Sequence, residues 1–447
     1  MTMGVGTLLV VAAPLIRGGN RHVALMALEW LALLALLGVL HWATRQTHSR
    51  WGTGREQLAL VALVTAPLWV GLLQLLPLPA SVWAALPGRA EWAGWMPTAG
   101  AAGQDAWRPL SLVPDATWSS ALAGLPLAAC FALALTLSAR QLRGFARLWI
   151  ALATVQAVMG LLQLGPLPGL RFDSLFGGAI GTFANNNHFA SFIVMTLPLV
   201  VMELRRALYE ADNRRQQRSA ALWGLLLFVL LSAWLAAGSR GAMASGGLVL
   251  AATWLLLPVS RESKRARWQT AGFVAALLLA LAAVGLDGVG RFFGERLVAD
   301  ASVRSLVREA TWQAAMDFWP VGSGLGSFGA VFVHYQPATI AEFVPHAHSD
   351  YVQLLMELGV LVLPLAAAAL YVGVRRTRVL WAAARHSALD DEGRRLAACG
   401  LGLLALLLHV WVDFNLRIPA NAMLGAFLAG ALCRRWSGGN AQTGGYR

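Results

Sequence analysis

Long apolar stretches alternate with short polar segments along almost the whole chain. A stretch of roughly 17 to 25 apolar residues is long enough for a helix to cross about 30 Å of hydrocarbon. Such stretches lie at 22–44, 58–77, 117–137, 147–164, 188–204, 220–237, 241–258, 269–286, 350–373, 396–414 and 416–433. A shorter one at 3–16 lacks a basic n-region and an Ala-x-Ala cleavage site, so we interpret it as a retained first span. The pattern predicts an all-α, polytopic membrane protein with about twelve transmembrane helices.

The amino-acid composition agrees with this class. Hydrophobic residues fill 57% of the 447 positions, charged residues only 13%, and the mean hydropathy is +0.60. These values are typical of an integral membrane protein and exclude a water-soluble globule. Cys130, Cys399 and Cys433 all lie in apolar stretches without a CxxC pattern. They therefore support neither a disulfide scaffold nor a structural zinc site.

Basic residues are distributed unevenly between the two sets of loops. With a cytoplasmic N-terminus, the inner segments are 45–57, 138–147, 205–219, 259–268, 374–395 and 434–447. They hold 24 of the 35 Lys and Arg residues, and the rest of the chain holds 11. Basic loops stay in the cytoplasm, so both termini are predicted there and most of the +13 net charge is a topology signal. No basic run is long enough to follow a nucleic-acid backbone, and we expect no nucleic-acid partner.

Two segments on the predicted outer side are too long to be simple connections. The segment 78–116 is rich in Trp, Pro and Gly, and the segment 287–349 contains a helical pattern of its own. The chain is thus divided into transmembrane helices 1 to 9 (1–286), a large outer loop (287–349) and transmembrane helices 10 to 12 with the tail (350–447). Function is expected in the long outer segments.

The large outer loop combines a helical pattern with a glycine-rich sequence. Apolar residues recur at helical spacing from Val303 to Phe318, and Arg304 and Arg308 share another face one turn apart. This predicts an amphipathic helix at the membrane surface that ends before Pro320. The glycine-rich sequence 322–328 precedes no strand–helix unit, so a flexible re-entry loop is favoured over a phosphate-binding loop.

A polar cluster at 345–350 runs directly into an apolar stretch. Asp350 and Gln353 have the spacing of a capping box, which predicts that a helix begins at Asp350 and places His348 just ahead of it, at the outer mouth. Asp350, Gln353 and Glu357 then form one polar stripe that enters the bilayer. Such residues face a cavity or a partner, and the alternative for Gln353 and Glu357 is that they only join helices.

Two further polar points are predicted on the outer side. One is Ser239-Arg240-Gly241 in a tight turn, and the other is Gly181-Thr-Phe-Ala-Asn-Asn-Asn187-His188 at the head of the sixth span. The positive-inside rule disfavours arginine on this side, although Arg240 could simply extend to the interface. Arg240 and Arg308 together offer two fork-shaped cations suited to a phosphate or pyrophosphate.

Taken together, these residues resemble the bacterial O-antigen ligase and polymerase superfamily, membrane enzymes that act on sugars carried by undecaprenyl pyrophosphate. The resemblance rests on the order of Gly181-Thr-Phe-Ala-Asn-x-Asn-His188, Ser239-Arg-Gly241, Arg308-x3-Trp312 with Pro320-x-Gly-x-Gly-x-Gly326, His348-Ser349 with Gly359, and His409-x3-Asp413-x5-Pro419. Ser349 stands where the family usually has Asn. The resemblance implies the C-type glycosyltransferase fold, with the periplasmic loop 287–349 covering the active site.

The resemblance also implies roles for individual residues. His348 would be the catalytic histidine, and Arg240 and Arg308 would hold the pyrophosphate of the donor. The supporting residues would be Asn187, His188, Arg304, Asp350, Gln353 and Glu357. An imidazole can take the proton of an acceptor hydroxyl near neutral pH, and arginines can stabilise a departing pyrophosphate. We therefore expect a metal-independent, inverting transfer without a cofactor.

A metal site is the rival interpretation of the same residues. His346, His348 and Asp350 have ligand types that could bind zinc, with His334 as the fourth ligand. No pair of outward carboxylates has the spacing of a metal-binding Asp-x-Asp.

The acceptor and the biological setting follow from the resemblance alone. Three acceptors fit it: another carbohydrate repeat (polymerase), the lipid A core (ligase), or a protein Ser or Thr. The Trp-rich segment 78–116 favours a polymerase, because aromatic rings stack on sugars, although Trp is also an ordinary interfacial anchor. The expected place is the bacterial inner membrane, with the active site facing the periplasm. The expected partners are undecaprenyl-pyrophosphate-linked oligosaccharide, a glycan acceptor, membrane lipids and a chain-length regulator.

A secondary transporter is the alternative from another class, since twelve spans are typical of carriers. Against it, the two halves of the chain show no resemblance to each other, and the polar points lie at the outer mouth and not at the bilayer midplane.

Overall fold

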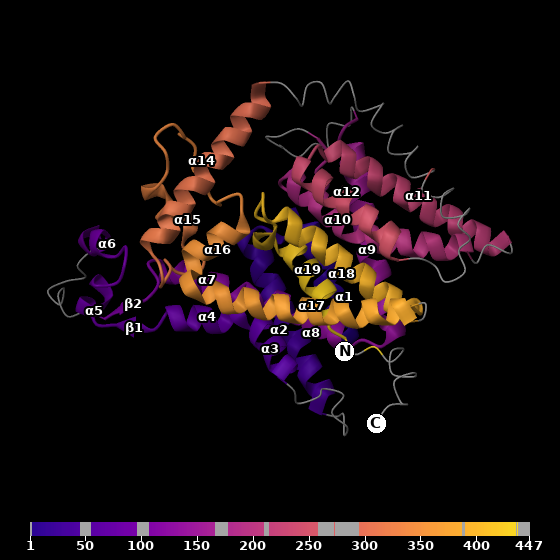
Figure 1. Ribbon diagram of the computed structural model, residues 1–447, viewed down its shortest axis with the longest axis horizontal. Helices are drawn as coiled ribbons and strands as arrows, with labels where there is room; N and C mark the ends of the chain where they lie inside the picture. The colour runs from indigo at the N-terminus through magenta and orange to yellow at the C-terminus, as the bar shows by residue number, and fades with distance from the viewer. Residues whose placement is uncertain are drawn as a thin grey trace.

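The computed structural model is built almost entirely of helices (Figure 1). It describes residues 2–44, 55–95, 107–165, 178–209, 214–257, 272, 295–386, 389–434 and 436. Helices cover eleven of the twelve predicted spans, and the other one, 269–286, lies almost wholly outside the described residues. Six described helices are long and apolar enough to cross a membrane, and three shorter apolar helices accompany them. An all-α polytopic membrane protein is thus confirmed, whereas the number of twelve spans stays a prediction.

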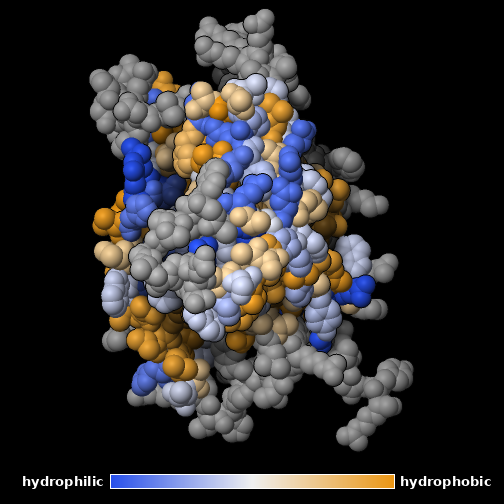
Figure 2. Space-filling model, turned by 90° about the vertical axis from the view of Figure 1, so that its left-hand side faces the viewer, coloured by the Kyte–Doolittle hydropathy of each residue, from blue (hydrophilic) through white to orange (hydrophobic). Residues whose placement is uncertain are grey.

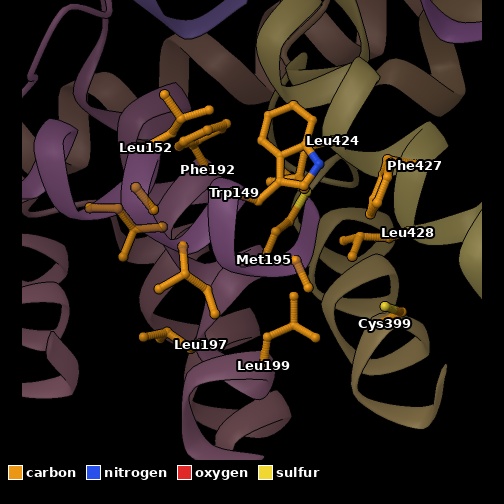
Figure 3. Close-up of a cluster of buried hydrophobic side chains, with 14 of the residues drawn as sticks. Trp149, Leu152, Phe192, Met195, Leu197, Leu199, Cys399, Leu424, Phe427 and Leu428 are labelled. Carbon is orange, nitrogen blue, oxygen red and sulfur yellow. The ribbon is translucent and has the colours of Figure 1, made fainter. Parts of the chain in front are cut away.

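A bundle of long helices forms the larger part of the molecule. Its members are α1 (Thr2–Leu15), α2 (His22–Thr44), α8 (Gly124–Thr136), α9 (Ala139–Leu162), α10 (Asn186–Tyr209), α11 (Arg214–Ala237), α12 (Arg240–Leu256), α18 (Asp391–His409) and α19 (Pro419–Leu432). Almost the whole apolar length of α10 is buried, with α9, α11, α12, α18 and α19 packed against it. Figure 3 shows this core, where Trp149 of α9 meets Phe192 of α10 and Phe427 of α19. The bundle therefore fixes the start of α10, where His188 lies.

Three of the predicted spans are broken helices. The span 58–77 consists of α3 (Arg55–Val64) and α4 (Ala66–Gln74), and the span 117–137 consists of α7 (Pro114–Leu122) and α8. Pro67 and Pro114 stand in the first turns of α4 and α7, where a proline without an N–H is tolerated. The span 350–373 consists of α16 (Asp350–Leu358), η5 (Gly359–Leu361) and α17 (Val362–His386). Gly359 ends α16 with φ +55°, a conformation that favours glycine.

A smaller unit lies at one end of the bundle, at the left of Figure 1. It contains β1 (Pro77–Leu78), α5 (Ala80–Ala84), α6 (Ala90–Trp95), β2 (Arg108–Pro109), α14 (Glu295–Asp317), α15 (Phe328–Val331) and η4 (Phe332–His334). The two strands pair antiparallel, and a separate apolar core joins Trp83, Val307, Phe318 and Phe332. Figure 2 looks at this end and shows hydrophilic side chains with hydrophobic ones between them. The described parts of the two long segments that the sequence predicts to lie outside thus fold onto each other.

The helix predicted from Val303 to Phe318 is present as α14, and part of its apolar face packs against protein. Val307, Ala314 and Phe318 are buried in the apolar core of the smaller unit, whereas Val303 is 40% exposed. Leu306 is also 38% exposed. Protein therefore covers the part of the apolar face that contains Val307, Ala314 and Phe318, and the position of α14 at the membrane surface stays a prediction.

The glycine-rich sequence 322–328 is not the flexible loop that was expected. It is mostly buried, and Gly322, Gly324 and Gly326 all have positive φ. A side chain at Gly322 would come within 2.6 Å of the carbonyl oxygen of Glu357, and one at Gly324 or Gly326 would overlap a serine hydroxyl. Hydrogen bonds also hold the sequence, since the N–H of Ser323 donates to Met356 and that of Leu325 donates to Gln74. These glycines allow three chain segments to pack closely.

Candidate functional site

The segment 345–349 brings His348 to the start of α16. His348 is half-buried and has φ +51°, and among the described non-glycine residues only Arg17 shares a positive φ. This conformation is costly for a residue with a side chain and is found most often at functional sites. The N–H of Asp350 donates to the carbonyl oxygens of Val410 and Asp413, which fixes the next turn. The position of His348 is therefore set by backbone contacts with the end of α18.

Phe414 contacts three histidines from two parts of the chain. Its ring centre lies 4.4 Å from that of His346, 4.6 Å from that of His188 and 5.3 Å from that of His348. His188 comes from the first turn of α10, and Phe414 precedes η6 (Asn415–Arg417). Two candidate residues from the sequence, His188 and His348, thus both pack against the ring of Phe414.

Asp413 forms the acidic centre of this cluster. Its carboxylate is buried and lies 3.6 Å from Nε2 of His188, and it accepts a hydrogen bond from the N–H of Phe414. Arg304 of α14 interacts electrostatically with both Asp413 and the buried His409. The sequence shows His409 and Asp413 as parts of a family motif but indicates no role for either residue. Their spacing of four residues placed them on one face of a helix end, but nothing local showed which residues they would meet.

Arg240 lies beside the histidine cluster because its neighbour in the chain, Gly241, packs against His409. Ser239 begins α12, and its hydroxyl accepts a hydrogen bond from the N–H of Ala242. Gly241 packs so closely against His409 that a side chain there would come within 2.9 Å of Nε2. Arg240 itself is exposed. The turn therefore stands beside the histidine cluster, with an arginine at its surface.

Arg308 and Asn187 lie next to residues of the cluster. Arg308 is half-buried and follows Arg304 by one turn of α14, which corresponds to roughly 6 Å along the helix. Asn187 is half-buried beside His188, and its N–H donates to the side chain of Asn185. The structure thus brings the outer candidates to one end of the bundle, with cations on α12 and α14.

The polar stripe of α16 has a protein partner. Arg417 lies 2.6 Å from a carboxylate oxygen of Glu357 and 3.8 Å from one of Asp350. Gln353 donates to Glu357 and accepts from the N–H of Ala347, so the network extends to the residue before His348. The sequence predicted a cavity or a partner for this stripe but did not identify Arg417. An arginine at the start of an apolar stretch was the available signal.

The helix start at Asp350 is confirmed, but the capping box is not formed. Ser349 is the N-cap residue and makes no side-chain capping bond. The Asp350 carboxylate accepts a hydrogen bond from the N–H of Leu416. The side chain of Gln353 is bonded to Glu357 and to the N–H of Ala347. Long-range partners have thus replaced the local ones, because η6 packs against this turn.

The predicted zinc ligands do not gather around one point. Asp350 faces Leu416 and Arg417, and the ring of His334 packs edge-on against Trp92, 4.4 Å away. Among the described residues, no three His, Cys, Asp or Glu side chains are arranged to hold a metal ion. Burial, with Arg417, His188 and His348 nearby, lowers the pKa of His346 to about 3. His346 is therefore neutral at physiological pH.

Comparison with known families adds an independent observation. Residues 225–384 match the family described as O-antigen ligase. The matched segment contains Arg240, Arg304, Arg308 and His348, but it ends before His409 and Asp413. A search of curated proteins gave no match. The match over 225–384 supports the resemblance to the O-antigen ligase and polymerase superfamily that the sequence motifs indicate.

Proposed function

We propose that the protein is a metal-independent, inverting glycosyltransferase that uses an undecaprenyl-pyrophosphate-linked glycan as donor. The supporting observation is the position of His348, in a left-handed backbone conformation and beside a cluster assembled from α10, α14 and the α18–α19 connection. Arginines on α12 and α14 border this cluster. A base next to cations is the arrangement that transfer from a pyrophosphate needs.

In the proposed step, His348 accepts the proton of an acceptor hydroxyl while that oxygen attacks the anomeric carbon. The bond from this carbon to the pyrophosphate oxygen breaks, and undecaprenyl pyrophosphate leaves with the bonding electrons. Arg240 and Arg308 stabilise the negative charge of the leaving group, which bidentate guanidinium groups do well. A single displacement inverts the anomeric configuration.

The residues around His348 have positioning roles in this proposal. His188 and Asp413 hold the ring of Phe414 against the histidine, and Arg304 offsets the buried charge of Asp413. Asp350, Gln353 and Glu357 anchor α16 through Arg417. The alternative stated for Gln353 and Glu357, that they join helices, is the one the contacts support.

We propose that the acceptor is the end of another glycan repeat and that the reaction takes place at the periplasmic face of the inner membrane. Trp107, which belongs to the Trp-rich segment 78–116 and is 65% exposed, can stack on a sugar. Trp83 is fully buried and donates to the carbonyl oxygen of Pro109, so it has a structural role. A ligase to the lipid A core and a protein oligosaccharyltransferase stay the competing acceptor assignments.

Reconstitution with a lipid-linked repeat tests the proposal. We expect wild-type protein in vesicles to lengthen the lipid-linked glycan in EDTA, and His348→Ala to form product at least about a hundredfold more slowly. Core lipid A and a Ser/Thr peptide, offered in parallel, distinguish the three acceptors. Activity that is lost in EDTA and restored by zinc would refute the metal-independent reaction.

A further inference from the structure

A partly open cavity lies at the end of the bundle away from α5 and α6. It has a volume of about 240 Å³ and is lined by Arg376, Val379, Leu380, Leu396, Leu432, Arg434 and Trp436. One water needs roughly 10–15 Å³ of such space, so the cavity can hold a much larger group. The chain between His348 and Arg376 runs along α16 and half of α17, roughly 42 Å at 1.5 Å per residue, and no residue of the candidate site lines the cavity. The cavity is therefore separate from the candidate active site.

The lining of the cavity combines cationic and apolar surfaces. Arg376 comes from α17 and Arg434 follows α19, while Leu380, Leu396 and Leu432 supply hydrocarbon. Val379 of α17, at the cavity, is 49% exposed. An apolar lining of this kind suits acyl chains, and a pair of arginines suits a phosphate.

The guanidinium group of Arg434 is only partly satisfied by protein groups. Its side chain is 9% exposed and lies 3.4 Å from Glu392, and burial lowers its pKa. Among the described residues, its Nη1 has no hydrogen-bond partner. A buried guanidinium nitrogen left in this way is costly, and a phosphate oxygen in the cavity would satisfy it.

We propose that this cavity binds the headgroup of an anionic phospholipid. Arg376 and Arg434 contact its phosphate, and the upper parts of its acyl chains lie against Val379, Leu380 and the other apolar side chains of the cavity lining. The segments that meet here, 374–395 and the tail, are among those that the basic-residue pattern predicts to be cytoplasmic. The lipid would then belong to the inner leaflet, where anionic headgroups are attracted to basic segments.

Lipid binding to the purified, full-length protein tests this proposal. Native mass spectrometry and thermal unfolding would compare phosphatidylglycerol, phosphatidylcholine and inorganic phosphate. We expect phosphatidylglycerol to bind and stabilise most. Arg376→Gln and Arg434→Gln should each weaken its binding by on the order of tenfold or more, since each removes a charge-assisted hydrogen bond.

Arg378→Gln is the matched control, because Arg378 is an exposed arginine of α17 outside the cavity lining. It should change binding by less than about twofold, the range of surface substitutions. Val379→Trp narrows the cavity without changing charge, so it should weaken binding even if Arg434→Gln fails to fold. Unchanged binding in Arg376→Gln and Val379→Trp, an equal loss in Arg378→Gln, or equal stabilisation by inorganic phosphate would each overturn the proposal.

Discussion

Replacing Arg417 by Gln should strongly destabilise the protein. Arg417 is the cationic partner of Glu357 and Asp350, whose side chains are fully buried. Removing one partner of a buried ion pair leaves an uncompensated charge and costs about 3–5 kcal/mol. Two carboxylates lose their partner here, so we expect the upper part of this range. Arg375→Gln, on the exposed surface of α17, should cost less than about 0.5 kcal/mol.

A double-mutant cycle separates the ion pair from other effects of the substitutions. Unfolding free energies would be measured in detergent for wild type, Glu357→Gln, Arg417→Gln and the double variant. Because the two side chains are 2.6 Å apart, the double variant should be more stable than the sum of the single effects predicts, by on the order of 2 kcal/mol. Additive effects, or an Arg417→Gln protein as stable as Arg375→Gln, would show that the network does not anchor α16.

The remaining predictions concern catalysis, backbone packing, pH and topology. His348→Ala should lower turnover by about 10²–10⁴ and leave donor binding unchanged. Arg240→Ala and Arg308→Ala should weaken donor binding as well as turnover, and lysine at either position should restore only part of both. The reverse pattern in a lipid-pyrophosphate binding assay would contradict the assigned roles. Gly324→Ala should lower the unfolding midpoint because a side chain would overlap Ser111 at φ +115°, while Gly373→Ala, with open space around it, should not. Histidine in an unfolded chain has a pKa of about 6.5, whereas His346 in the folded protein has a pKa of about 3. Unfolding at acid pH therefore takes up a proton, so the free energy of unfolding should fall as the pH is lowered from 6.5 toward 4. This fall should be smaller in His346→Gln. A reporter fused after Arg214 should be active only in the cytoplasm, and activity on the other side would refute the topology.

The helices could be predicted because the length of an apolar stretch can be seen directly in the local sequence. Eleven predicted spans coincide with described helices, and the start of α16 at Asp350 was placed correctly. Breaks such as the one at Thr65 were missed, because a proline at 67 ends one helix and starts another inside a single apolar stretch.

The site was less predictable because its contacts join distant segments. His348 stood out as a polar residue at the mouth of a span, and Arg240 as an arginine on the unexpected side. Arg417 and Asp413 gave no comparable signal, since their partners are about 60 and 225 positions away in the chain. The glycine-rich sequence was misjudged for the same reason: its neighbours, Ser111 and Glu357, belong to other segments.

The pairing of α16 with Arg417 also constrains how the chain is inserted during synthesis. When α16 leaves the ribosome, Asp350 and Glu357 have no cation, because Arg417 follows about 60 residues later. A buried carboxylate without a partner is unfavourable in lipid. We therefore expect α16 to reach its final depth only after α18 and α19 have been inserted, so that the C-terminal hairpin completes the outer mouth.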